Sequence, residues 1–281
     1  VPDPFIWKDI NITKLEEIWT RQERSTSLYN TVNDEKNIMS IYSKIATEKN
    51  YNTLKKYDTV FANTQNTINM MPLDDLEKTM KKDKHKKQLK EYKMRHYKNV
   101  IYKNKTRLKN CMLNEQQKLT IKYLYFNPNC VIVLDDCGAV LNKFQKKDIM
   151  RKLFFQGRHN NITLILTLQD DLSLNSSIKK NAFVSIFTTR RCASSYFERV
   201  SNAFSKQEKE TASSVVNDIF KKSGYIKLAY VRDIEHPFRF ILAGRYGKFK
   251  FGSKHIWELC SKLKKSTDSN KINNLLATFK I

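Results

Sequence analysis

The feature that most constrains the fold is the stretch from Val131 to Asp136, in which four apolar residues run directly into two adjacent carboxylates. This mostly β-branched run is preceded by Asn127-Pro128-Asn129 and followed by Gly138, which predicts a strand buried on both faces of a parallel sheet. Ligand sites in such sheets lie at the carboxyl ends of the strands. Asp135 and Asp136 therefore suit a divalent metal and a polarised water. The alternative is a strand that ends in a polar turn, with Asp136 capping the next helix.

Two more strands are predicted along the chain, and helical segments separate all three. Ile162–Leu168 leads to Gln169, and Phe183–Phe187 is followed shortly by Arg190 and Arg191. Strands that alternate with helices indicate an α/β fold with a parallel sheet and right-handed crossovers. The three polar strand ends should then lie along one edge of the sheet. Later, residues 225–231 and 238–243 alternate like the two strands of a β-hairpin.

The three strand ends together resemble the parts of a nucleotide-hydrolysing site. Such a site needs carboxylates for a metal, an amide for a water or phosphate oxygen, and cations for phosphate. In this interpretation Asp135 holds Mg²⁺, Asp136 orients the attacking water, and Gln169 senses the γ-phosphate.

The charge of the chain points to a polyanionic partner. Its 52 Lys and Arg residues outnumber 28 Asp and Glu residues, which gives a formal net charge of +24. Nucleic acid is the partner that best relieves such self-repulsion, although an A/T-biased genome would also enrich a protein in lysine. The five cysteines form no CxxC pair, so neither a zinc site nor a disulfide framework is indicated. No stretch has the ~20 apolar residues of a membrane span, and no signal peptide is recognisable.

Residues 23–112 predict a basic, mainly helical insertion. Apolar residues recur there at helical spacing, and the segment 78–109 is dense in Lys and Arg with Tyr92, Tyr97 and Tyr102 between them. One interpretation is a surface that contacts DNA or RNA phosphates, with tyrosines available for stacking. The other is a solvated helical face whose tyrosines pack inward.

Several of these segments together resemble a known family. The apolar strand with Asp135-Asp136, then Gly157-Arg158-His159-Asn160-Asn161, then a strand ending in Thr167-Leu168-Gln169, is similar to the genome-packaging ATPases of large nucleocytoplasmic DNA viruses. Those belong to the FtsK/HerA group of P-loop ATPases. The resemblance covers residues 113–245 well, 1–22 loosely and 23–112 hardly at all.

The resemblance implies a P-loop NTPase-like sheet flanked by helices and a role for each site residue. Asp135 and Asp136 match the Walker B motif, and Gln169 matches the polar sensor. Arg158 is the candidate for a charge that reaches the nucleotide of a neighbouring subunit, with Arg190 and Arg191 as rivals. The alternative interpretation is that Arg158 is a cation that interacts with the free backbone carbonyl groups at a helix end.

The resemblance also implies a domain plan and a function. Residues 1–22 and 113–247 would form the ATPase core, 23–112 the insertion and 248–281 a basic tail. The expected cofactors are ATP and Mg²⁺. The expected work is translocation of double-stranded DNA into a capsid by a homo-oligomeric ring that meets a capsid or portal protein, in the virus factory of the host cytoplasm or in the virion.

One departure from the family concerns the P-loop. Its motif G-x-x-x-x-G-K-S/T cradles phosphates with backbone N–H groups and a lysine, and none of the six glycines here, at 138, 157, 224, 244, 247 and 252, heads such a motif. We therefore expect either a P-loop upstream of Val1 or a copy that has lost hydrolysis. Two other functions stay open: a non-enzymatic nucleic-acid-binding protein on a degenerate ATPase fold, and a metal-dependent nuclease that uses Asp135 and Asp136.

Overall fold

The chain forms two compact units in the computed structural model, which describes residues 6–169, 174–202, 204–222, 225–232, 234–243, 257–258 and 261–262. The first unit comprises residues 1–17, 131–159 and 163–281, and the second comprises residues 18–130 and 160–162. Apart from positions 257, 258, 261 and 262, the predicted basic tail from 248 to 281 lies outside the described residues.

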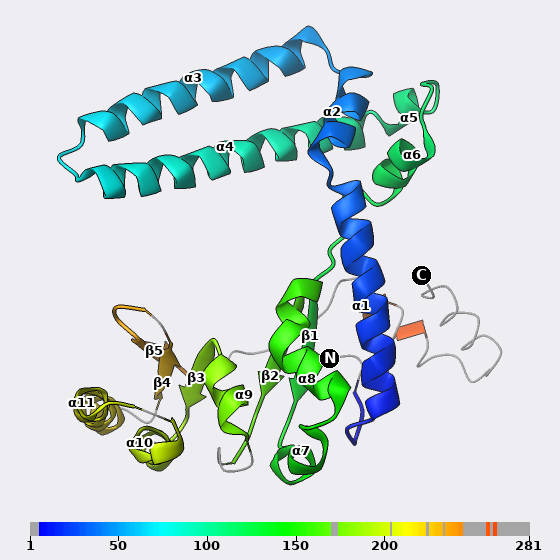
Figure 1. Cartoon of the computed structure of the whole chain (residues 1–281). Helices are drawn as coiled ribbons and strands as arrows, with labels where there is room; N and C mark the ends of the chain where they lie inside the picture. Colours follow the sequence, from blue (N-terminus) through cyan, green and yellow to red (C-terminus); the bar gives the residue numbers. More distant parts are fainter. Residues whose placement is uncertain are drawn as a thin grey trace. The chain divides into compact units, whose positions relative to one another are not determined.

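The second unit is helical (Figure 1). α3 and α4 run antiparallel as a long hairpin, because Asp58 of α3 pairs with Lys93 of α4 (2.5 Å) while Gln65 approaches His85 (3.4 Å). Asp74 caps α4 by accepting a hydrogen bond from the Glu77 N–H (2.7 Å). The helices of this unit are α1 (Ile12–Val32, whose first turns belong to the first unit), α2 (Glu35–Ser43), α3 (Glu48–Met70), α4 (Asp75–Lys103), α5 (Lys105–Leu108) and α6 (Glu115–Lys122).

The core of the second unit lies where α2 meets the end of α4. Ile38, Ile41 and Ile101 are fully buried there. Tyr97 also packs in this core, whereas Tyr92 and Tyr102 are 54% and 55% exposed, so only these two of the three tyrosines remain on the surface.

α6 packs on α2 in the same unit. The Asn37 side-chain amide donates to the Thr120 hydroxyl (2.6 Å), and the Gln117 amide donates to that of Ser40 (2.9 Å). Residues 115–122, which the family resemblance assigns to the ATPase core, lie in the same compact unit as most of residues 23–112.

The first unit contains two small sheets. β1 (Cys130–Leu134) and β2 (Ile162–Leu166) form a parallel pair, and the Thr167 N–H donates to the Leu134 carbonyl (3.0 Å) just beyond β2. Ile132 and Leu134 of β1 are buried, but Val131 and Val133 are 55% and 53% exposed. The prediction that β1 is buried on both faces is therefore wrong, because the side on which these two valines lie is only partly covered.

The second sheet is antiparallel and has the order β3 (Val184–Phe187), β4 (Ile226–Val231), β5 (Phe238–Leu242). The predicted hairpin is confirmed as β4 and β5. The prediction that the third strand joins the first two in one parallel sheet is wrong in the described structure, where β3 pairs with β4. Leu228 and Ala229 of β4 are buried. β4 is the central strand of the sheet, and β3 forms its hydrogen bonds along the edge of β4 that β5 leaves open.

Helices and two small sheets together make up the chain, so the coarse α/β class is confirmed (Figure 1). α10 and α11 pack on the antiparallel sheet around Phe197, Val216 and Tyr230. No helix in the described ranges combines the length and the apolar character needed to cross a membrane. The remaining helices of the first unit are α7 (Gly138–Phe144), α8 (Asp148–Gln156), α9 (Ser176–Asn181), α10 (Arg190–Glu198) and α11 (Lys206–Lys222), with 3₁₀ turns η2 (Gly157–Asn160) and η3 (Val200–Asn202).

Candidate functional site

Four polar residues meet where β1 and β2 end, and we call them the strand-end cluster: Asp135, Asp136, Thr167 and Gln169. The Thr167 hydroxyl accepts a hydrogen bond from the Asp136 backbone N–H (3.0 Å) and donates one to the Asp135 carboxylate. The Gln169 amide donates to the Asp136 carboxylate (3.4 Å). All four side chains are exposed, so a ligand from solvent can reach them.

Asp136 holds an unusual backbone conformation. Its φ of 46° lies in the left-handed region, which costs a residue with a Cβ about 1 kcal/mol or more. The bond from its N–H to Thr167 helps to keep it there. Strain of this kind gathers at functional sites, because the surrounding structure must hold a side chain in one direction.

Cys137 follows directly but does not take part as an ionised ligand. Its thiol is buried and donates to the Leu134 carbonyl (3.6 Å), and burial raises the pKa of the Cys137 thiol. The thiol is therefore neutral at physiological pH.

The first turn of α10 lies against the strand-end cluster. The Cys192 thiol donates to the Gln169 carbonyl (3.7 Å), and the Cys192 N–H donates to the capping hydroxyl of Thr189 (3.3 Å). Arg190 and Arg191 are exposed residues of this turn. The structure thus brings the chain after β3 to the ends of β1 and β2, although β3 itself belongs to the other sheet. Two arginines and a helix N-terminus give this side a positive potential.

Arg158 lies elsewhere in the subunit. It is an exposed residue of η2, which precedes β2, so it stands at the amino end of a strand whose carboxyl end carries the cluster. A strand of five residues is roughly 16 Å long. Arg158 therefore makes no contact with the strand-end cluster of its own chain.

Thr167 is the site residue that the sequence analysis missed. A signal for it existed, because residues two apart in an extended segment point to the same side, and Thr167 stands two residues before Gln169. The donor set fits Mg²⁺, which binds through one or two carboxylates while keeping several waters. Within the part of the chain that the structure describes, no group of three or more His, Cys, Asp or Glu residues is arranged so that it could hold a metal ion.

Comparison with known proteins gives a family match and several similar viral proteins. The family model "Zonular occludens toxin (Zot)" matches residues 44–222. The "Uncharacterized protein B354L" of African swine fever virus, isolate Pig/Kenya/KEN-50/1950, is 34% identical over 248 residues, which are 88% of this chain. The same protein from the isolate Tick/Malawi/Lil 20-1/1983 shows the same identity and coverage. This chain spans 66% of the length of these relatives. No solved structure matches.

These matches confirm the family resemblance in a coarser form, since they join a P-loop ATPase-like family to a viral relative. The family model covers well over half of the chain, including the strand-end cluster and the first turn of α10. On this evidence the chain belongs to the zonular occludens toxin (Zot) family, a P-loop ATPase-like morphogenesis family.

Proposed function

We propose that this chain carries the later part of an ATP-driven motor that moves double-stranded DNA into a viral capsid. The observation that carries the proposal is the strand-end cluster, in which residues from two parallel strand ends are joined by hydrogen bonds. Membership of a P-loop ATPase-like family and similarity to a viral protein support it.

Each residue of the cluster has a role in this proposal. Asp135 would hold Mg²⁺ through water, and the bound ion would supply positive charge against the phosphates of the nucleotide. Asp136 orients the attacking water, and its amide partner Gln169 detects whether a γ-phosphate is present. Arg190 and Arg191, on the helix turn beside Gln169, attract the phosphates.

Arg158 acts between subunits. Arg158 is exposed at the amino end of β2, so its side chain cannot reach the strand-end cluster of its own chain. In a homo-oligomeric ring it would reach the nucleotide of the neighbour and stabilise the charge of the transition state, as an arginine finger supplied in trans does. The ring would deliver DNA to a capsid or portal protein in the virus factory or the virion.

The exposed side of the β1–β2 pair is where the P-loop part would dock. Parallel strands are normally covered on both faces, yet Val131, Val133 and Ile165 are 55%, 53% and 44% exposed. A further strand and helix that carry the P-loop would bury these side chains and place phosphates at the cluster. This layer would come from residues that the present sequence does not contain, and the relatives are longer than this chain.

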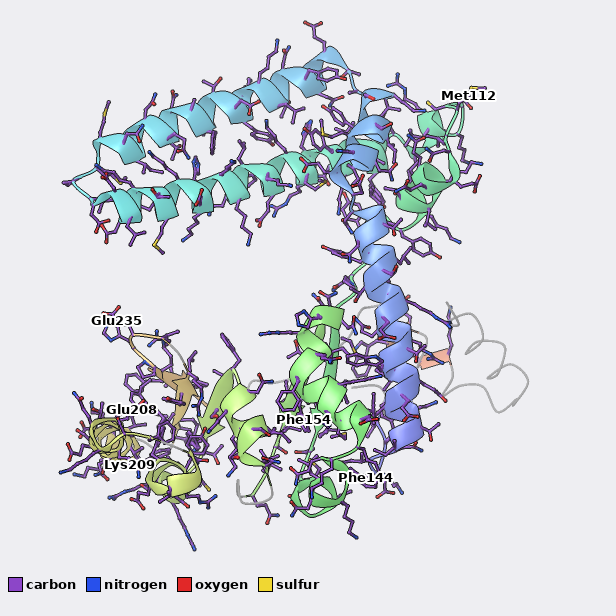
Figure 2. The ribbon with its side chains drawn as sticks, in the orientation of Figure 1. Met112, Phe144, Phe154, Glu208, Lys209 and Glu235 are labelled. Atoms are coloured by element: carbon purple, nitrogen blue, oxygen red, sulfur yellow. The ribbon has the colours of Figure 1, made fainter. Side chains whose placement is uncertain are left out.

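The α3–α4 hairpin supplies the DNA contacts. The segment from Lys78 to Lys90, with both ends included, contains seven lysines and one aspartate. Lys81, Lys84 and Lys87 are exposed at helical spacing, and none of them forms an ion pair with another described residue. Figure 2 shows side chains projecting along both helices. Contacts of this kind neutralise phosphates without reading sequence.

The test is DNA-stimulated ATP hydrolysis by the full-length protein and by its Asp136→Asn variant. Asparagine tolerates the left-handed conformation, so the change removes the carboxylate charge and keeps the backbone. We expect the turnover rate to fall by about 100-fold or more while DNA affinity stays unchanged. The matched control is Asp218→Asn, which alters an exposed carboxylate on α11 and should leave turnover as it was.

Two results would refute the motor. One is equal turnover in the Asp136→Asn and Asp218→Asn variants. The other is a full-length protein that binds DNA but no nucleotide. The second result would favour a non-enzymatic nucleic-acid-binding protein, which would use the exposed lysines of α4.

A further inference from the structure

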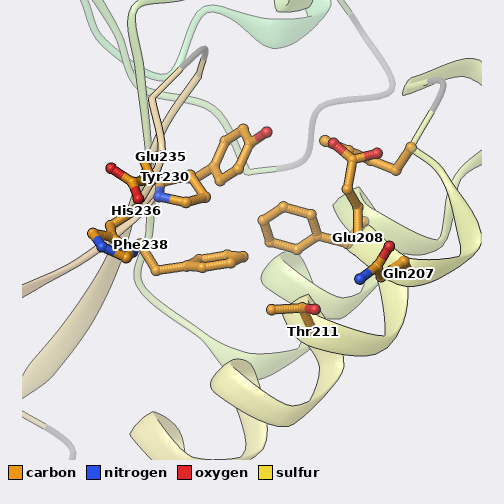
Figure 3. Close-up of a pocket in the computed structure, with 10 residues that line it drawn as sticks. Gln207, Glu208, Thr211, Tyr230, Glu235, His236 and Phe238 are labelled. Atoms are coloured by element: carbon orange, nitrogen blue, oxygen red, sulfur yellow. The ribbon is translucent and has the colours of Figure 1, made fainter.

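A cavity of about 490 Å³ lies in the first unit between the start of α11 and the turn that joins β4 to β5 (Figure 3). It shares no residue with the strand-end cluster. Its volume is within the ~300–1,000 Å³ range of ligand pockets, so it can hold a side chain or a small molecule.

Four aromatic rings form the wall of this cavity, and we call them the aromatic box: Phe197, Phe204, Tyr230 and Phe238. Phe197 and Tyr230 are buried and lie edge to face with their centroids 5.2 Å apart, so this pair forms the floor of the cavity. The Phe204 centroid lies 5.1 Å from that of Phe197 and 5.8 Å from that of Tyr230. The Phe238 centroid lies 5.8 Å from that of Phe197 and 5.6 Å from that of Tyr230. The face of an aromatic ring carries partial negative charge, so such a box attracts a cation.

Two carboxylates stand at the rim on opposite sides, Glu208 on α11 and Glu235 in the turn (Figure 3). The Ser205 N–H donates to Glu208 (2.7 Å), and this bond with that of the Ser205 hydroxyl lowers the pKa of the Glu208 carboxyl. Glu208 is therefore ionised at physiological pH. Glu235 is exposed and forms no ion pair with any described residue.

The chain already places one guanidinium group on this aromatic box. Arg232 lies with its guanidinium carbon 5.6 Å from the centroid of the Phe204 ring and donates to the Tyr196 hydroxyl (3.5 Å). Arg232 is close enough to Glu208 to lower the pKa of that carboxyl. His236 also lines the cavity. The Arg239 guanidinium donates to the His236 and Phe238 carbonyls at the same turn, but Glu235 forms no ion pair with it or with any other described cation.

We propose that the aromatic box is a docking pocket for an arginine side chain on a basic segment of a partner protein. Guanidinium is planar and stacks on aromatic faces, so arginine fits better than lysine. The carboxylates repel the phosphates of a nucleotide or of DNA. They also penalise a purely apolar occupant, which would desolvate charge without pairing it.

The test titrates the full chain with three blocked peptides that differ only at the central position, which is arginine, lysine or citrulline. Citrulline keeps the shape of arginine and lacks its charge. Binding is followed by calorimetry and by NMR shifts of the Phe238 and Tyr230 ring protons. We expect the arginine peptide to bind at least ~10-fold more tightly than the citrulline peptide, with the lysine peptide between them.

Two variants locate the binding. Glu235→Gln should weaken the arginine peptide by about 3-fold, since an exposed charge pair contributes little more. Glu210→Gln is the matched control, because it removes an exposed carboxylate of α11 that does not line the cavity. Phe238→Leu, which keeps an apolar wall, should weaken the arginine peptide and leave the citrulline peptide unchanged. The melting temperature of each variant shows that it has folded.

Four outcomes would overturn the proposal. They are equal affinity for the arginine and citrulline peptides, equal effects of the Glu235→Gln and Glu210→Gln changes, no binding of any peptide, and ring-proton shifts caused by a DNA oligonucleotide instead. None of these measurements depends on ATP, so they can refute the arginine pocket without refuting the proposed motor function.

Discussion

One hydroxyl group, that of Thr167, joins the ends of two parallel strands. It accepts from the backbone of Asp136 and donates to the carboxylate of Asp135. The direction of the Asp135 carboxylate and the backbone conformation of Asp136 therefore both depend on Thr167. This arrangement resembles the outer shell of a metal site, where an orienting partner fixes the direction of the ligand.

Replacing this hydroxyl should reduce activity without unfolding the chain. Thr167→Val keeps the shape and removes both hydrogen bonds, and we expect DNA-stimulated ATP turnover of the full-length protein to fall by about 10- to 100-fold. Thr167→Ser restores the hydroxyl and should recover most of the rate. Steady-state kinetics of the two variants provide the measurement. A serine variant as slow as the valine variant would contradict the role of the hydroxyl.

His96 makes the stability of the helical unit depend on pH. Its ring lies within 5.9 Å of the Tyr42 ring and 6.1 Å of the Tyr57 ring, and burial lowers the pKa of His96 below its ordinary value of 6.5. Below pH 6.5 the unfolded chain therefore binds more protons than the folded chain, and stability falls as the pH drops. Above that pH both forms are neutral and the effect vanishes.

The corresponding experiment compares thermal unfolding of the wild type and the His96→Phe variant in matched buffers at mildly acidic and mildly alkaline pH. The wild type should lose more stability on acidification than the variant, since phenylalanine keeps the aromatic contacts and cannot be protonated. Parallel losses in both proteins would show that another group titrates.

At the scale of elements, the sequence predicted those helices and strands that are determined by residues close together in the chain. Helical spacing indicated the helices of residues 23–112, and the alternation of residues 225–231 and 238–243 indicated β4 and β5. The partner of β3 could not be predicted in this way, because Phe187 pairs with Leu228, about forty residues later, and no local signal encodes such a choice. The exposed face of β1 was not predicted for a related reason. An apolar run indicates that both faces of a strand tend to be buried, but it does not show whether residues of the same chain bury them.

The outward face of α4 has a testable role in nucleic-acid binding. Changing Lys81, Lys84 and Lys87 to glutamine removes three exposed charges, so the slope of log affinity against log salt should become shallower by about 2 to 3 units if each lysine neutralises one phosphate. Affinity for DNA duplexes of different sequence should fall equally. Fluorescence anisotropy over a salt series measures both quantities.

A second triple variant controls for the loss of charge alone. Lys206, Lys221 and Lys222 are exposed on α11, and their change to glutamine lowers the net charge by the same amount. If this control loses as much affinity and slope as the α4 variant, the binding follows overall charge and not the hairpin.

At the scale of the whole molecule, the chain enters the helical unit within α1 and leaves it at the start of β1, so residues 18–130 form most of that unit and 160–162 complete it. Within that unit the core lies at the base of the hairpin, around Ile41, Tyr97 and Ile101. Only Ile68 of α3 is buried toward the tip. The distal part of the hairpin therefore contributes little to folding, which allows it to be removed.

The last prediction concerns a shortened hairpin. Asp58 and Lys93 form an ion pair (2.5 Å), and the rings of Tyr57 and Tyr92 lie 6.4 Å apart, so a short glycine-rich turn can join Asp58 to Tyr92 in place of residues 59–91. The removed segment carries seven lysines and five carboxylates, and the net charge falls only from +24 to +22.

Helical content per residue and the melting temperature should stay close to those of the intact chain, because the core at the base is retained. DNA affinity should fall by about 10-fold or more, since several phosphate contacts are lost together. In the full-length protein, ATP turnover without DNA should persist while its stimulation by DNA is lost. Undiminished affinity would show that DNA binds elsewhere on the chain, because the total charge has scarcely changed.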